Sequence, residues 1–114
     1  MVNQTNKMST YILESMNDGR NKFVKNYPNG VRIDNYPQKP EGRVKFFPHI
    51  YIPSELWNDR VNVFVKDECD MNCSYTRDKG YMVYFKRVKC MNLRESLMEM
   101  ELLKPIAQHI NRIK

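Results

Sequence analysis

Residues 46–67 read FFPHIYIPSELWNDRVNVFVKD, and their pattern decides how the rest of the chain is interpreted. An apolar run ends at Pro53, which has no backbone N–H to donate to a neighbouring strand. Residues 54–57 can form a turn, and alternation resumes over residues 60–66, where a valine at every second position predicts a strand with one buried face. This stretch therefore predicts two strands, 43–52 and 60–66, joined by a turn.

Further elements are expected on both sides of this stretch. Asn29-Gly30 lies between two alternating runs, which is a strong short-range signal for a hairpin. Residues 80–89 begin with apolar side chains on both faces, which is typical of a central strand. Near the N-terminus, Ser9 as an N-cap and Gly19 as a stop predict one short helix.

The C-terminal residues give the clearest helix pattern. Asn92 can cap the helix, and Glu95 completes a capping box. An apolar stripe recurs at spacings of three and four residues and consists of Leu93, Leu97, Met100, Leu103, Ala107 and Ile110. Pro105 removes a backbone donor within this run, so we expect it to kink the helix or split it. The expected fold class is α+β, a small antiparallel sheet of about five strands with a kinked C-terminal helix packed on it.

Length and composition indicate a single domain over residues 1–114, with a polar tail at residues 1–8. The formal net charge is +6, and basic residues exceed acidic ones in residues 1–40 and 80–114, which favours a polyanionic partner. Three cysteines without an export signal predict reduced thiols in a cytoplasmic protein. Because no apolar run approaches the roughly 20 residues that span a bilayer, we expect no membrane association.

Motifs for metal binding and catalysis do not emerge from the sequence. Cys69 and Cys73 are spaced more loosely than a usual zinc pair, and Tyr75 stands where a calcium loop needs glycine. A carboxylate-based nuclease would have to draw, without any guiding spacing, on Asp34, Asp59, Asp67 and Glu68. We therefore predict a protein that is not an enzyme and that uses no cofactor, metal or small-molecule substrate.

Aromatic and basic residues interleave in KGYMVYFKRVK, residues 79–89, as they do in the strand signature of RNA-recognition domains. Matching that spacing requires the deletion of one residue. Only one face of such a strand could stack bases, and packing in the core is the commoner role of these aromatic residues.

Residues 43–89 resemble the AbrB-like swapped-hairpin family of DNA-binding proteins. In that family a strand ends in Ile-Pro, a Glu-Leu turn follows, and a second strand begins shortly afterwards. Here the matching residues are Ile52-Pro53, then Glu55-Leu56, then the run that begins at Arg60. The resemblance implies DNA binding by a dimer in which the hairpins of two chains interlock.

The sequence departs from that family at several positions. His49 stands where the family usually has an arginine, Asn58 replaces a glycine, and residues 68–79 form an added loop. In its richness in asparagine, tyrosine, methionine and lysine, the chain is also similar to small proteins of archaeal rod-shaped and filamentous viruses.

Two functional hypotheses follow. The first is a small, basic, non-enzymatic protein that binds duplex DNA, such as a viral regulator, with contacts from Arg43, Lys45, His49, Arg60, Lys86, Arg87 and Lys89. The alternative is a protein–protein interaction module, such as a host-directed viral accessory protein, in which the basic charge is incidental. Both hypotheses expect a homodimer, with an interface drawn from the helical residues Leu97, Met100, Leu103, Ala107 and Ile110.

Overall fold

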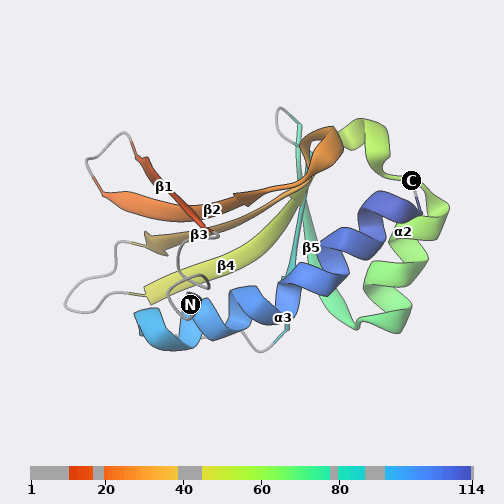
Figure 1. Ribbon diagram of the computed structural model, residues 1–114. Coiled ribbons are helices and arrows are strands. Elements are labelled where there is room, and N and C mark those ends of the chain that lie inside the picture. Colours follow the sequence, from red (N-terminus) through yellow and green to blue (C-terminus); the bar gives the residue numbers. More distant parts are fainter. Residues whose placement is uncertain (1–10, 17–19, 39–44, 78–79, 87–91, 114) are drawn as a thin grey trace, which may run out of the picture.

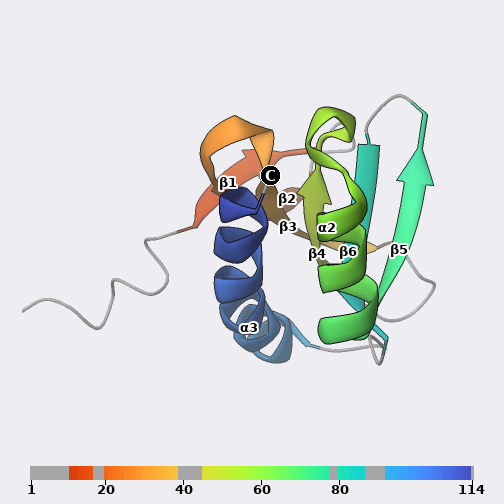
Figure 2. The same cartoon turned by 90° about the vertical axis from the view of Figure 1, so that its right-hand side faces the viewer.

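The computed structural model describes residues 11–16, 20–38, 45–77, 80–86 and 92–113, which form one antiparallel sheet with helices on a single face (Figures 1 and 2). The strands are β1 (Ile12–Ser15), β2 (Asn21–Asn26), β3 (Arg32–Gln38), β4 (Lys45–Ile52), β5 (Met71–Thr76) and β6 (Gly80–Phe85). Their order across the sheet is β1-β2-β3-β4-β6-β5. The helices are α2 (Asp59–Val63), which continues into a π-helical turn (Phe64–Glu68), and α3 (Leu93–Arg112). The α+β class is confirmed, with one strand more than expected in the described residues.

Strand β4 lies at the centre of the sheet and joins its two parts. It pairs with β3 along Lys45–Tyr51, but with β6 only at Ile50, Tyr51 and Ile52. Ile50 is fully buried and stands opposite Ile33 on one side and Val83 on the other. The prediction of a strand ending at Pro53 is confirmed.

Pro53 packs at a crowded corner where β4 ends. A Cβ atom on Gly80 would lie 2.6 Å from the carbonyl oxygen of Ile52, and a Cβ atom on Gly30 would lie 2.9 Å from Cγ of Pro53. Gly80 also has a φ of +114°, which side chains strongly disfavour. Gly30 in the turn between β2 and β3 and Gly80 at the start of β6 therefore allow the chain to pass close to the end of β4.

Residues 60–66 are helical, so the strand predicted there is wrong. Asn58 caps α2, because its Oδ1 accepts a hydrogen bond from the backbone N–H of Val61 at 2.9 Å. Val61 and Val65, four residues apart, are buried, whereas Val63 between them is 45% exposed. The burial thus follows a helical period. The second strand that the swapped-hairpin pattern requires is consequently replaced by a helix.

Local predictions elsewhere had mixed outcomes. A short 3₁₀ turn, Pro28–Gly30, joins β2 to β3, so the hairpin at Asn29-Gly30 is confirmed. The region expected to be a loop at 68–79 contains the edge strand β5, and residues 12–15, which were expected to be helical, form β1. These two strands lie at opposite edges of the sheet.

Helix α3 begins as predicted, with a complete capping box between Asn92 and Glu95, and runs through Pro105 without splitting. Four residues of the apolar stripe, Met100, Leu103, Ala107 and Ile110, are fully buried in the chain's own core, and Leu97 is partly buried. These four residues are covered by the sheet and are not available at a surface between chains. Pairing of two chains stays a prediction, and it would have to use a different surface.

The two neighbouring leucines of α3 allow a matched test of this arrangement. Leu103 is fully buried and Leu102 is 60% exposed. We expect Leu103→Ala to lower the free energy of unfolding by about 2–5 kcal/mol because it leaves a cavity in the core. Leu102→Ala should change it by less than about 0.5 kcal/mol. Urea denaturation followed by circular dichroism measures both, and equal effects would contradict the assignment of the core face.

Candidate functional site

One face of the sheet points away from α2 and α3 (Figure 2). It carries Asp34 and His49, two of the four buried polar residues in the described part of the chain. Side chains alternate between the faces of a strand, so every second residue of β3 and β4 points to this helix-free face. The register places three pairs opposite one another on it: Arg32 with Tyr51, Asp34 with His49, and Tyr36 with Phe47. Alternation on two strands thus brings charges and aromatic rings together.

A hollow of about 190 Å³ lies on this face. Its lining includes Lys22 of β2, Asp34 of β3, His49 of β4, Met82 of β6 and Thr76 of β5. Residues of β2 and β5 can share one hollow only if the sheet curls, and Figure 1 shows its strong twist. The curled sheet therefore shelters polar groups that a flat sheet would leave in solvent.

Asp34 lies on the floor of the hollow and is only 4% exposed. Its Oδ2 accepts a hydrogen bond from Nε of Arg32 at 3.1 Å. Within the described residues, its Oδ1 has no hydrogen-bond partner. A buried carboxylate oxygen without a donor is unfavourable by roughly 1–3 kcal/mol or more, so this atom is a strong acceptor.

His49 lies beside Asp34 and is 2% exposed. Its Nδ1 lies 3.0 Å from the carbonyl oxygen of Phe47. A carbonyl can only accept, so Nδ1 carries the proton. Burial lowers the pKa of His49, and this effect exceeds the opposing effects of the Phe47 carbonyl and of Asp34. The ring is therefore neutral at pH 7, and Nε2, 3.8 Å from Oδ2 of Asp34, presents a lone pair.

Aromatic rings surround these two groups. The Tyr36 ring meets the His49 ring edge to face at 5.5 Å, and the Phe47 ring lies 4.8 Å from it. The guanidinium of Arg32 lies 5.3 Å from the centre of the Tyr51 ring. Burial, and then the charge of Asp34, raises the pKa of Tyr36, so its hydroxyl stays protonated and can donate. The site thus combines flat apolar walls, two cations and two acceptors.

Of the seven predicted DNA contacts, the described part of the chain allows the side chains of three to be placed: His49, Arg60 and Lys86. His49 lines the hollow, whereas Arg60 is exposed on α2, in the layer on the opposite face of the sheet. Lys86 follows β6 and pairs with Asp70 at 2.7 Å. The backbone of Lys45 lies in β4, but its side chain is outside the described part. Three further predicted contacts fall outside the described residues altogether: Arg43, Arg87 and Lys89.

Sequence reasoning named two residues of the hollow, His49 as a DNA contact and Asp34 among the acids of a possible nuclease, but it did not place them beside each other. The sequence signal of the hollow was the stretch RIDNY, residues 32–36, in which Arg32, Asp34 and Tyr36 share one face of a strand. An acid on one face of a predicted hairpin strand indicates a polar surface at most. Its position opposite His49 depends on the register between β3 and β4.

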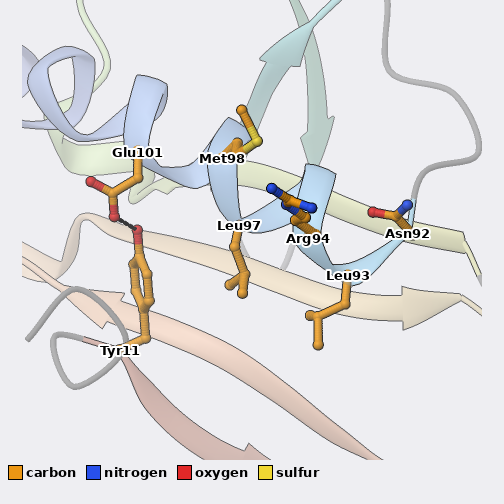
Figure 3. A pocket seen from close by; sticks show the side chains of 7 residues that line it. All are labelled: Tyr11, Asn92, Leu93, Arg94, Leu97, Met98 and Glu101. Carbon is orange, nitrogen blue, oxygen red and sulfur yellow. Dashed lines mark hydrogen bonds between the residues drawn. The ribbon is translucent and has the colours of Figure 1, made fainter. Parts of the chain in front are cut away.

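A second concavity, of about 640 Å³, lies along the N-terminal half of α3 (Figure 3). Leu93 and Leu97 extend from α3 on the side where Tyr11 lies, and the Tyr11 hydroxyl donates to Oε2 of Glu101 at 2.5 Å. Met98 is 62% exposed. Burial and the neighbouring Glu101 raise the pKa of Tyr11, so this hydroxyl remains a donor. We call this concavity the α3 groove, and it is mainly apolar.

Comparisons with known protein families, with curated proteins and with solved structures return no match for this chain. Among the residues described, no cluster of three or more acidic, histidine or cysteine side chains is arranged to hold a metal ion. No helix in that part of the chain is long and apolar enough to cross a membrane.

The lowered pKa of His49 has a consequence for stability. In the unfolded chain a histidine has a pKa near 6.5, so below that pH the unfolded state binds a proton that the folded state resists. The free energy of unfolding should therefore fall as the pH decreases below about 6.5, until the folded state also becomes protonated.

Denaturant titrations at several pH values test this expectation. His49→Gln should flatten the pH dependence, whereas His109→Gln, which alters the only other histidine, should keep the decline caused by His49. The assignment would be contradicted if the unmodified protein and His49→Gln showed the same dependence.

Proposed function

We propose that this protein binds single-stranded nucleic acid, without catalysis, through the helix-free face of its sheet. The observation that carries the proposal is the combination of half-buried aromatic rings and cationic side chains around one hollow. The rings that line the hollow are those of Tyr36 and Tyr51, and the cations are Lys22 and Arg32. The Phe47 ring lies 4.8 Å from the ring of His49. The net charge of +6 supports a polyanionic partner.

Binding of a single strand requires one kind of side chain for the bases and another for the phosphates. Bases present flat faces that stack on aromatic rings, and each stacked base contributes about 1–3 kcal/mol. Lysine and arginine beside those rings neutralise the phosphates that connect the bases. Arg32 already lies over the Tyr51 ring, so a charge and a stacking surface are adjacent.

A single strand suits this surface better than the duplex DNA proposed from the sequence. Bases in a duplex are stacked on one another and cannot enter a hollow, whereas unpaired bases can be turned outward. In addition, Arg60 and His49 lie on opposite sides of the sheet and could not contact one stretch of duplex together.

The α3 groove favours the alternative function, a protein–protein interaction. Its lining of Leu93, Leu97 and Met98 is apolar, and exposed apolar surface often marks contact with another protein. The groove is bounded by Tyr11 and Asn92, which adjoin residues 1–10 and 87–91 outside the described part. This second candidate would leave the helix-free face without a role.

Fluorescence anisotropy with labelled oligonucleotides tests the proposal. We expect a short single strand to bind more tightly than a duplex of the same length, and log K to fall by about 0.7 per phosphate contact for each unit of log salt. Lys22→Gln should reduce this slope by about 0.7 because one phosphate contact is lost.

Lys66→Gln provides the matched control. Lys66 is exposed in the π-helical turn on the other side of the sheet, and its substitution removes the same charge. It should leave the slope unchanged. Absence of binding at low salt, or binding that does not respond to salt, would rule out a nucleic-acid role and favour the protein-interaction alternative.

A further inference from the structure

The floor of the hollow presents hydrogen-bond acceptors from two adjacent side chains, since Nε2 of His49 lies 3.8 Å from the carboxylate of Asp34. The acceptors are Oδ1 of Asp34, which has no donor among the described residues, and Nε2 of His49, whose lone pair is free because Nδ1 carries the proton. Both side chains are more than nine-tenths buried and both line the hollow. A complementary ligand would bring two adjacent N–H donors.

A metal cation fits this floor poorly. Arg32 lies 3.1 Å from the Asp34 carboxylate, and Lys22 lines the same hollow, so their positive charges oppose a further cation. In the part of the chain described, no third acidic, histidine or cysteine side chain completes a metal site. The donors that match the floor therefore belong to an uncharged edge of an organic group.

The walls and the rim of the hollow restrict that group further. Tyr36 and Tyr51 provide flat walls, and the volume of about 190 Å³ exceeds the roughly 150 Å³ of an apolar cavity known to bind benzene. Arg32 is more exposed than Asp34 and His49, which places its positive charge nearer the rim. One planar ring system linked to an anionic group matches this combination.

Among the nucleobases, guanine alone presents two adjacent donors, N1–H and the 2-amino group, on its pairing edge. Adenine and cytosine each place a ring nitrogen acceptor beside a single amino group, and uracil or thymine has one N–H between two carbonyl groups. A second acceptor on any of these edges would face an acceptor of the protein, which is repulsive.

We propose that the hollow binds one unpaired guanine base, with its N1–H and 2-amino donors directed at Asp34 and His49. Tyr36 and Tyr51 contact the faces of the base, and Lys22 and Arg32 contact the adjacent phosphates. This inference rests on the proposed function and names the base that the site selects within a single strand.

The first test changes only the ligand. Oligothymidine strands of about nine nucleotides carry at their centre guanine, hypoxanthine, adenine or thymine, and their affinities for the unmodified protein are compared. We expect guanine to bind about tenfold more tightly than thymine or adenine, since hydrogen bonds to charged groups are worth that much. Hypoxanthine, which lacks the 2-amino group, should fall between them.

The second test changes only the protein. Asp34→Asn and the exposed Asp67→Asn each remove one negative charge. Any general gain in affinity for phosphates should therefore be the same in both variants. We expect the guanine preference to vanish in Asp34→Asn and to persist in Asp67→Asn. Circular dichroism verifies that each variant is folded, and the ligand series still tests the guanine site if Asp34→Asn does not fold.

The outcomes separate the two proposals. Salt-dependent binding of all four strands with equal affinity would overturn the guanine site and leave the single-strand function standing. No binding of any strand would overturn both. Preference for guanine that survives Asp34→Asn would overturn the assignment of the base to this hollow.

Discussion

The packing of α3 against the centre of the sheet determines which face of the sheet can take part in binding. Met100, Leu103, Ala107 and Ile110 are buried together with residues such as Ile33 and Ile50, so the face of the sheet under α3 belongs to the core. Adjacent residues of a strand point to opposite faces, so this contact also directs Asp34 and His49 to the other side. The position of α3 thus decides on which face of the sheet Asp34 and His49 lie.

The curled sheet then changes the environment of those polar groups. A carboxylate on a flat, solvated sheet would keep its water, but Asp34 is almost fully buried and only one of its oxygens is paired within the described residues. Such an arrangement is unfavourable for folding by itself. Groups that break the usual rules of burial are found most often where a protein binds a ligand.

Local signals in the sequence were sufficient for some elements and misleading for others. The capping box at Asn92 and the turn at Asn29-Gly30 depend on neighbouring residues alone, and both occur as predicted. In the sequence alone, the valines at positions 61, 63 and 65 fit a strand as well as they fit a helix. The local cap from Asn58 and the burial of Val61 and Val65 in the core favour the helix.

The site depended on information that is not local, whereas the edge strand β5 did not. Strand β5, MNCSYT, alternates Met71, Cys73 and Tyr75 with polar residues, and the loop predicted at 68–79 overlooked this period of two. The floor of the hollow arises from the pairing of Asp34 with His49 across two strands. Composition and spacing could name these residues, but the register between strands was needed to bring them together.

The junction between β4 and β6, where Ile50, Tyr51 and Ile52 pair with Val83, Met82 and Tyr81, affects how the chain folds. The turns that join β2 to β3 and β5 to β6 are short, so these pairs can form from neighbouring residues. Ile52 and Tyr81, in contrast, are brought together only after α2 and β5 have been traversed. Closing that long segment loses chain entropy before the contacts of the junction are gained. The rate of folding should therefore depend chiefly on when this junction closes, and substitutions there should slow folding more than substitutions in either hairpin.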